Sequence, residues 1–323
     1  MRNLATKLKR RLQIASDPLP RSLNIELTNT CNSKCSMCPR ENMVQSKQMK
    51  VGHIDYNFFK DIVDSSARNK NTIFTLVGLG EPLLYPKLQA AIKYILKKCP
   101  TCPIRISSNG IALNETNARM LIKSLDAKDK LTISLNADNP KAYQWLMGVD
   151  RYNVVTTNIK NFLLLRKKIN GGKAPSLVIQ LLITKKTKNS AERFNQEWQP
   201  LVMPQDKISI KSLLNWGGKI NTKTLGVANK GKRFPCYSLW TIISVDREGN
   251  VYPCCEAFSS REKSQLLLGN LRDESLANIY NEKIKFFRDK HLNGQWSSIQ
   301  ECAKCDFWSD APNIWFEISG KWF

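Results

Sequence analysis

From residue 22 to about residue 211, the sequence alternates short apolar runs with longer amphipathic stretches. The apolar runs have the length of buried strands, and the stretches between them have the periodicity of helices with one buried face. This alternation predicts repeated βα units around a parallel sheet, because parallel strands need a crossover connection. The expected strands cover residues 23–27, 73–77, 104–107, 131–135, 177–183 and 207–211, and the clearest helical segments cover residues 86–98 and 153–168.

The number of these units limits the architecture. Six βα units are too few for an eight-stranded barrel, so we expect an open, partial α/β barrel with its site at the C-terminal ends of the strands. After Trp216, Gly217 and Gly218 the alternation stops, and two β-rich runs flank a turn at residues 246–250, before a helix over residues 276–288. The sequence therefore predicts an N-terminal extension (1–21), a partial barrel (22–218) and a smaller C-terminal module (219–323).

Composition limits the class of protein. The net charge of +23 favours acidic partners, but the basic residues are spread along the chain, which favours a solvated basic surface. We find no apolar run of about 20 residues and no signal peptide, so we expect a cytoplasmic protein without a transmembrane segment. Within residues 1–14, Leu4, Leu8 and Leu12 recur among basic residues, which predicts a helix that rests on a membrane surface or caps the barrel.

The cysteines carry the strongest chemical signal. Ten cysteines without a secretory signal favour metal ligation or catalysis over a disulfide framework. Directly after the first expected strand, Cys31, Cys35 and Cys38 form a C-x3-C-x2-C loop. Structural zinc takes four protein ligands, whereas an iron–sulfur cluster held by three cysteines keeps one iron open to another ligand. Three thiolates with one open position indicate a catalytic cluster.

Polar and glycine-rich segments follow the next three expected strands. They are Gly78-Leu79-Gly80-Glu81-Pro82, then Ser107-Ser108-Asn109-Gly110, then Ser134-Leu135-Asn136. With the cysteine loop, they resemble the radical S-adenosylmethionine (SAM) superfamily over nearly the whole chain, since that family has Gly-Gly-Glu-Pro, Thr-Asn-Gly and Ser-(Leu/Ile)-Asp there. Met37 departs from the family pattern, which usually has an aromatic residue before the third cysteine.

The resemblance implies a cofactor and its binding residues. In this family, a [4Fe–4S] cluster binds SAM through its open iron, and a flavodoxin- or ferredoxin-type reductant supplies the electron that cleaves SAM to methionine and a 5′-deoxyadenosyl radical. Glycines let the main chain approach SAM, carbonyls or a carboxylate receive its ammonium group, and hydroxyl and amide side chains bind it or merely cap loops. The expected SAM contacts are Met37, Gly78, Gly80, Glu81, Pro82, Ser108, Asn109, Ser134 and Asn136.

A second set of four cysteines can satisfy one further cluster or one zinc ion: Cys236, Cys254, Cys302 and Cys305. Their spacing resembles the shortened SPASM, or twitch, module of radical SAM dehydrogenases in aminoglycoside biosynthesis, which holds one auxiliary [4Fe–4S] cluster. Cys255 points away from Cys254 in an extended segment, so we expect only Cys254 to be a ligand.

The remaining cysteines limit the number of clusters. Outside the first loop and the second set, the chain has only Cys99, Cys102 and Cys255, which excludes a seven-cysteine SPASM domain with two auxiliary clusters. Cys99 and Cys102 are expected at the opposite end of the barrel, where a structural or incidental role is favoured over a third cluster.

Several functions fit this pattern. A fully ligated auxiliary cluster favours electron transfer, so our first hypothesis is a radical SAM oxidoreductase that oxidises a sugar, a cyclitol or a similar small polar substrate. A peptide-modifying maturase and a radical epimerase or dehydratase are alternatives. A metal-bound nucleic-acid-binding protein is least favoured, and no nucleic-acid partner is expected, since the basic residues are not interleaved with aromatics on one face.

The acid, base and substrate contacts are much less determined. Lys211, at the end of the sixth strand, and Arg233 and Tyr237, at the entry to the second module, are candidate substrate contacts, and Cys255 is a candidate hydrogen donor. Trp216, Tyr237 and Trp240 wall the pocket or pack between the domains. Neither histidine, His53 or His291, has a partner motif, so neither is assigned a catalytic role.

Overall fold

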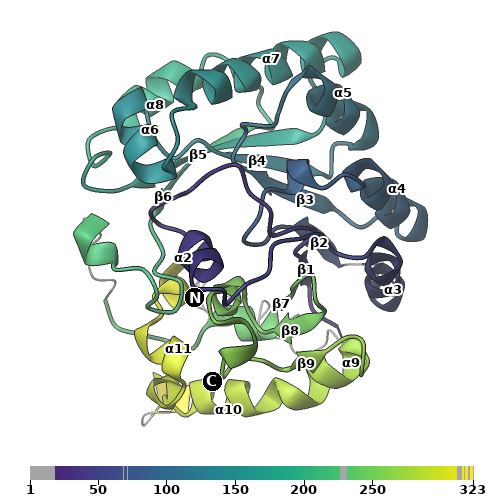
Figure 1. Ribbon diagram of the computed structural model, residues 1–323, viewed down its shortest axis with the longest axis vertical. Coiled ribbons are helices and arrows are strands. Elements are labelled where there is room, and N and C mark those ends of the chain that lie inside the picture. The colour runs from purple at the N-terminus through teal and green to yellow at the C-terminus, as the bar shows by residue number, and fades with distance from the viewer. Residues whose placement is uncertain are drawn as a thin grey trace.

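The computed structural model describes residues 19–322, apart from residues 68, 71, 226–230, 311–314, 316, 319 and 320. The helix predicted within residues 1–14 lies outside the described residues. Within the described part, one sheet has nine strands in the order β6-β5-β4-β3-β2-β1-β7-β8-β9 (Figure 1). Its two edges, β6 and β9, are separate, so the barrel is open.

The strands of the partial barrel lie within a few residues of the predicted positions. They are β1 (Ser22–Ile25), β2 (Ile73–Leu76), β3 (Ile104–Ser108), β4 (Lys130–Ser134), β5 (Ser176–Ile183) and β6 (Lys207–Ser212). Each pairs with the next in parallel, with Leu23 opposite Phe74 at the start of the series. The predicted α/β partial barrel is confirmed.

Helices cover the outer face of this sheet, and short α2 (Arg40–Gln45) lies on the inner side (Figure 1). Local caps set where several of them begin, since the side chains of Asp55, Asn114 and Asn139 each accept a main-chain N–H of the first turn. The outer helices are α3 (Tyr56–Ser66), α4 (Leu88–Lys98), α5 (Glu115–Ser124), α6 (Pro140–Met147), α7 (Tyr152–Asn170) and α8 (Ala191–Trp198).

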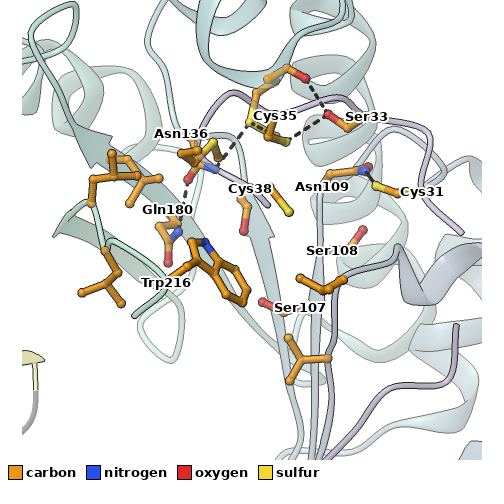
Figure 2. A pocket seen from close by; sticks show the side chains of 18 of the residues that line it. Cys31, Ser33, Cys35, Cys38, Ser107, Ser108, Asn109, Asn136, Gln180 and Trp216 are labelled. Atoms are coloured by element: carbon orange, nitrogen blue, oxygen red, sulfur yellow. Dashed lines mark hydrogen bonds between the residues drawn. The ribbon is translucent and has the colours of Figure 1, made fainter. Parts of the chain in front are cut away.

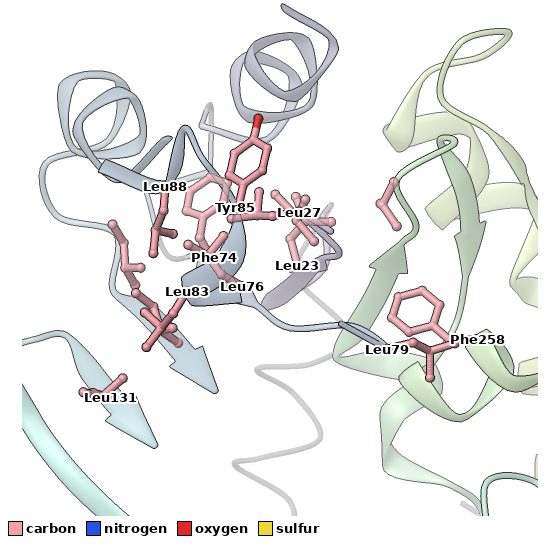
Figure 3. Close-up of a cluster of buried hydrophobic side chains, with 14 of the residues drawn as sticks. Leu23, Leu27, Phe74, Leu76, Leu79, Leu83, Tyr85, Leu88, Leu131 and Phe258 are labelled. Carbon is pink, nitrogen blue, oxygen red and sulfur yellow. The ribbon is translucent and has the colours of Figure 1, made fainter. Parts of the chain in front are cut away.

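The main core lies between the sheet and these helices and continues into the C-terminal module. Leu23 and Phe74, from neighbouring strands, are fully buried, and Figure 3 shows them packed with Tyr85 and Leu88. Phe258 of the C-terminal module belongs to the same cluster. The two modules therefore share one core, and the apolar area buried there contributes to the stability of both.

The C-terminal module extends the sheet of the barrel. Strand β7 (Ile242–Val245) pairs in parallel with β1, and it forms the predicted hairpin with β8 (Asn250–Tyr252). Strand β9 (Gly269–Asn270) completes this edge. As a result, β1 has a strand on each side, and the cysteine loop that follows it lies next to the second module.

Short elements make up the rest of that module. The helix predicted over residues 276–288 consists of three segments, α9 (Leu276–Asn278), η6 (Ile279–Lys283) and α10 (Lys285–Leu292). The other elements are η1 (Pro82–Leu84), η2 (Thr222–Leu225), η3 (Tyr237–Trp240), η4 (Cys255–Ser259), η5 (Arg261–Lys263), η7 (Trp296–Ser298), α11 (Gln300–Lys304), η8 (Phe307–Asp310), β10 (Glu317–Ile318) and β11 (Lys321–Trp322).

Cys99 and Cys102, between α4 and β3, form a disulfide, a pairing that was not predicted from the sequence. They lie at the N-terminal end of β3, away from the strand ends that carry the candidate motifs.

Among the described residues, no helix combines the length and the apolar content that crossing a bilayer requires.

Candidate active site

A cavity of about 340 Å³ opens where the barrel strands end. Every strand from β1 to β6 contributes to it through its last residues or the loop that follows, as expected for a parallel barrel. Figure 2 shows the polar side chains and the cysteines facing one another across it. The wall includes Cys31, Cys35, Cys38, Gly78, Gly80, Glu81, Ser107, Ser108, Asn109, Ser134, Asn136, Gln180, Leu182, Lys211, Ser212, Leu213, Leu214 and Trp216.

The cysteine loop is fastened to the end of helix α6. Ser33 donates a side-chain hydrogen bond of 2.8 Å to the Met147 carbonyl, and the Lys34 N–H donates one of 3.1 Å to the same oxygen. On the other side, Arg40 Nε donates to the Asn29 carbonyl at 2.6 Å. These contacts hold the three thiols toward the cavity before any ligand binds.

Burial raises the pKa of all three thiols above the ordinary value of a cysteine. Burial raises the pKa of Cys35 to about 11 and that of Cys38 to about 12, so metal binding has to displace the thiol protons. Within the described ranges, no three His, Cys, Asp or Glu side chains converge on the position of one metal ion. In a cubane, each cysteine binds a different iron, so an arrangement around one point is not required, and the donor set fits such a cluster.

Glu81 connects the loops that follow β2 and β3. Its side chain is only 2% exposed, and burial raises its pKa. One carboxylate oxygen accepts the Leu83 N–H at 3.0 Å, and the other accepts the Asn109 N–H at 2.7 Å. Because both oxygens are already hydrogen-bonded within the chain, the main-chain carbonyls of this loop are the better candidates for receiving a ligand ammonium group.

Amide side chains line the middle of the cavity. Asn109 donates to the Asn32 side chain at 2.8 Å, and its Nδ2 lies 3.8 Å from the sulfur of Cys31 (Figure 2). Asn136 has a positive φ of 61° and accepts a 3.1 Å hydrogen bond from Gln180. An asparagine tolerates this left-handed conformation better than most residues, which explains its position at the sharp turn after β4.

A second, smaller cavity lies in the C-terminal module. Burial raises the pKa of Cys254 well above its ordinary value, and the neighbouring cysteines raise it further. Two buried donors, Arg233 Nε and His291 Nε2, have no hydrogen-bond partner among the described residues, so both can donate to a group bound in this cavity. The lining is Gly217, Arg233, Cys236, Ser238, Leu239, Cys254, Glu256, Leu266, His291, Glu301, Cys302, Cys305, Phe307 and Trp308.

The two cavities share a wall, because Glu256 and Phe307 line both. The end of β6 is fastened to the segment that carries the last cysteines: the Asn215 N–H donates to Asp306 at 3.0 Å, and the Asn215 side chain donates to the Lys304 carbonyl at 2.7 Å. The two cysteine sets therefore face neighbouring spaces across a fixed boundary.

The sequence of this chain matches two known protein families. Residues 25–174 match the Radical SAM superfamily, and residues 223–306 match SPASM, an iron–sulfur cluster-binding domain. The chain therefore contains a radical SAM domain followed by a SPASM domain. The radical SAM domain implies a [4Fe–4S] cluster with SAM, and the SPASM domain implies auxiliary iron–sulfur binding. Both expectations from the sequence are confirmed at this level.

Known proteins resemble this chain over most of its length or over part of it. A tungsten-containing aldehyde ferredoxin oxidoreductase cofactor-modifying protein of Pyrococcus furiosus is 22% identical over 88% of each chain. A GTP 3′,8-cyclase of Streptomyces coelicolor is 28% identical over 135 residues, which are 41% of this chain and 38% of the cyclase.

Solved structures share the fold. BtrN, in complex with AdoMet and 2-DOIA, superposes with a TM-score of 0.57 and 18% identity over 89% of this chain and 93% of BtrN. SuiB of Streptococcus suis, bound to the precursor peptide SuiA, gives a TM-score of 0.63 and 13% identity over 96% of this chain and 75% of SuiB.

The predicted SAM contacts lie together in the larger cavity, with one exception. Met37, Gly78, Gly80, Glu81, Ser108, Asn109, Ser134 and Asn136 all line it, whereas Pro82 does not. Pro82 is buried and begins the short helix η1, where its fixed φ suits the first position. Its place in the radical SAM motif is therefore explained by local folding.

The candidate substrate contacts separate. Lys211 lines the larger cavity, but Arg233 lines the smaller one among the cysteines, and Tyr237 packs against an aromatic cluster around Trp315. Cys255 begins the helix η4 and lines neither cavity. Of these four candidates, Lys211 alone lies on the larger cavity, and the structure does not bring the four together.

Sequence reasoning missed several residues of the cavity walls. Gln180 and Met147 reach the larger cavity from β5 and α6, and Glu256 and Phe307 reach it from the second module. Glu256 stands two residues after Cys254, and Phe307 two after Cys305, so proximity to a predicted ligand was the available signal. Gln180 and Met147 carried no such signal in the sequence.

The glycines of the motif permit close packing within the radical SAM barrel. A Cβ atom on Gly80 would lie 2.2 Å from the Thr28 carbonyl oxygen, and one on Gly78 would lie 2.4 Å from Cγ of Glu26. The loop after β2 is thus pressed against the segment that leads into the cysteine loop, and glycine leaves room for that contact.

Gly80→Ala is accordingly expected to destabilise the fold by about 1–3 kcal/mol, because the added methyl group meets main chain that cannot move aside. The thermal unfolding midpoint checks this. The matched control is Gly52→Ala, whose Cβ would approach only the Arg247 guanidinium, at 3.1 Å, and should change stability by about 0.5 kcal/mol or less. Equal effects of the two substitutions would contradict the packing explanation.

Proposed function

We propose that this radical SAM enzyme oxidises a small polar substrate, such as a sugar or a cyclitol, and delivers an electron from it to an auxiliary cluster. The observation that carries the proposal is the shared wall: Glu256 and Phe307 line both cysteine-bearing cavities. A substrate in the larger cavity then lies next to the second cluster site. Transfer of an electron from the substrate to the auxiliary cluster requires that the two lie close together.

Each cysteine set has a separate part in this scheme. Cys31, Cys35 and Cys38 would hold the SAM-binding cluster, and the second cluster would be held by Cys236, Cys254, Cys302 and Cys305. When bound, the first cluster and SAM supply one-electron reductive cleavage of SAM and hence a radical that abstracts hydrogen. The chain's own residues position the substrate and keep water from the reacting atoms.

The walls of the larger cavity favour a small hydroxylated substrate. Its volume, about 340 Å³, lies at the low end for ligand pockets, and SAM has to share it. Lys211, Gln180 and Glu256 bring a cation, an amide and a carboxylate to it, a mixture that suits hydroxyl groups. Trp216 closes one side and has a positive φ of 50°, a conformation that a bulky residue adopts only when its surroundings impose it.

A peptide substrate is the competing proposal. SuiB bound to a precursor peptide shares the fold, but this chain covers only 75% of SuiB, and the identity is 13%. The limited volume of the cavity favours the small molecule. Epimerisation and dehydration use the same hydrogen abstraction and differ in their products.

We further propose a cytoplasmic location and a flavodoxin- or ferredoxin-type reductant. Eight cysteines, including both proposed ligand sets, are free thiols. A reducing compartment keeps thiols available to iron. The small disulfide between Cys99 and Cys102 lies apart from both cavities.

The test uses anaerobically reconstituted protein with SAM, dithionite and a panel of sugars and cyclitols deuterated at their carbinol carbons. The expected result is substrate-dependent 5′-deoxyadenosine that carries deuterium, together with a product that has lost the carbinol deuterium and the hydroxyl proton. A product in which hydrogen has replaced that deuterium, with no other change in composition, would instead indicate epimerisation, and loss of water would indicate dehydration. Turnover of a peptide, with none of the small molecules consumed, would overturn the proposal.

Removing the auxiliary cluster should uncouple oxidation from SAM cleavage. In the Cys302→Ala, Cys305→Ala double variant, iron should fall from roughly eight to roughly four per chain. Deuterium should still reach 5′-deoxyadenosine, but the oxidised product should fall by at least about a hundredfold, or about 2.7 kcal/mol of barrier. Cys255→Ala, next to a proposed ligand but outside both cavities, is the control and should retain both activities.

A further inference from the structure

His291 occupies an unusual position for a residue without a motif. It lies on α10, its side chain is fully buried, and Nδ1 accepts the main-chain N–H of Cys236 at 3.1 Å. A ring nitrogen that accepts a hydrogen bond carries no proton, and an imidazolium would donate from both nitrogens. The imidazole is therefore neutral, with its single proton on Nε2.

The proton on Nε2 of His291 has no acceptor among the described residues. His291 lines the cavity of the second cysteine set. Buried donors are almost always paired, because an unpaired one loses its hydration without compensation. The ring of Trp296, with its centroid 6.1 Å away, packs beside the imidazole and limits its rotation.

The other groups on this cavity have mixed charge. Arg233 lies there with its Nε also unpaired, and its guanidinium stacks 5.2 Å from the Trp296 ring centroid. Glu256 and Glu301 bring carboxylates to the same wall. Because these opposite charges offset one another, the net charge of the cavity does not by itself determine the reduction potential of a bound cluster. Individual hydrogen bonds to the cluster then contribute more to that potential.

We propose that His291 Nε2–H donates a hydrogen bond to a sulfur of the auxiliary cluster or of its cysteine ligands and thereby raises the reduction potential of that cluster. This inference rests on the proposed function, in which the four cysteines hold an iron–sulfur cluster. The reduced cluster carries one more negative charge than the oxidised cluster, so a donor stabilises the reduced form more. His291 is thus a positioning residue for the electron acceptor, and it touches neither SAM nor substrate.

Two substitutions separate the two ring nitrogens. His291→Asn places an amide oxygen near the position of Nδ1, so it keeps the acceptor for the Cys236 N–H and leaves no group at Nε2. His291→Gln reaches the position of Nε2 with an amide N–H and so keeps the donor. Both are made in full-length protein that also carries Cys31→Ala, Cys35→Ala and Cys38→Ala, so that redox titration followed by electron paramagnetic resonance reports the auxiliary cluster alone.

We expect His291→Asn to lower the potential by about 59 mV, which corresponds to a tenfold change in the one-electron reduction equilibrium. His291→Gln should remain close to the parent protein. Equal potentials for the parent and His291→Asn, with a full complement of iron and sulfide, would overturn this inference alone. An equal drop in both variants would also overturn it, since the Nε2 donor would then not be the cause. Zinc without sulfide in the unsubstituted protein would overturn the proposed function and the inference with it.

A second measurement needs no substitution at His291. The chain has only two histidines, and His53 is bonded through Nδ1 to Thr28 at 2.9 Å, in the barrel. After labelling with ¹⁵N-histidine, pulsed electron paramagnetic resonance of the reduced auxiliary cluster should show one coupled histidine nitrogen, unchanged by His53→Asn. Absence of that coupling would contradict the hydrogen bond directly.

Discussion

Replacing Cys31, Cys35 and Cys38 together with alanine is expected to abolish reductive cleavage of SAM while the second cluster stays bound. The three thiols are the only cysteines on the larger cavity, and without them the described residues offer no thiolate ligands there. Formation of 5′-deoxyadenosine should fall at least about a thousandfold, or about 4 kcal/mol of barrier. Iron should fall from roughly eight to roughly four per chain. Chromatography of the reaction after dithionite reduction and iron analysis measure both quantities.

The control for this variant is Cys255→Ala. Cys255 is a half-buried thiol that lines neither cavity, so the variant should retain both the iron and the cleavage of SAM. If the triple variant kept half or more of its 5′-deoxyadenosine formation, the first cysteine loop would not be the SAM-binding cluster site. If it lost all its iron, the two sites would not be independent.

The strands of the barrel were predictable because their signal is local. Each apolar run and each amphipathic stretch is visible within about twenty residues, and capping residues such as Asp55 and Asn139 reinforce it. The disulfide between Cys99 and Cys102 was missed because the same C-x2-C spacing also serves metal sites and redox motifs.

The pairing of β7 with β1 was not predictable by such reasoning. The register places Asn24 opposite Ser244, and the two side chains share a hydrogen bond of 3.1 Å across 220 residues of sequence. Only packing selects this neighbour for β1, and packing between distant segments leaves no periodic trace in the chain.

The candidate site, like the fold, has parts that the sequence predicts and parts that it does not predict. The cysteine spacing and the strand-end motifs were visible in the sequence, and the residues concerned meet in two cavities. His291 had no motif because its partner is a main-chain N–H, that of Cys236, and any sequence supplies such a group. Arg233 and Tyr237 were candidates because they stand at the entry to the second module, and position along the chain does not determine the cavity that a side chain reaches.

Loss of Arg261 should strongly destabilise the fold. It lies 7% exposed between two fully buried carboxylates, Glu26 of the barrel at 2.9 Å and Asp246 of the C-terminal hairpin at 3.1 Å. Glu26 also accepts the Leu79 N–H at 2.9 Å, so the same network reaches the loop of the SAM motif. Because β1 and β7 are neighbours, one guanidinium neutralises charges from both modules at once.

In Arg261→Met, the side chain keeps its volume and loses its charge, so Glu26 and Asp246 remain buried without a counter-ion. Removing one partner of a buried ion pair costs about 3–5 kcal/mol, and we expect a loss of that size in the free energy of unfolding, measured by urea titration under anaerobic conditions. The control is Lys98→Met, which breaks a 2.9 Å pair with Asp64 that is exposed on both sides, and which should cost about 1 kcal/mol or less. Similar losses in the two variants would show that the buried network does not join the modules, whereas a large loss in Arg261→Met alone would show that this network stabilises the contact between the SAM-binding barrel and the SPASM domain at β1.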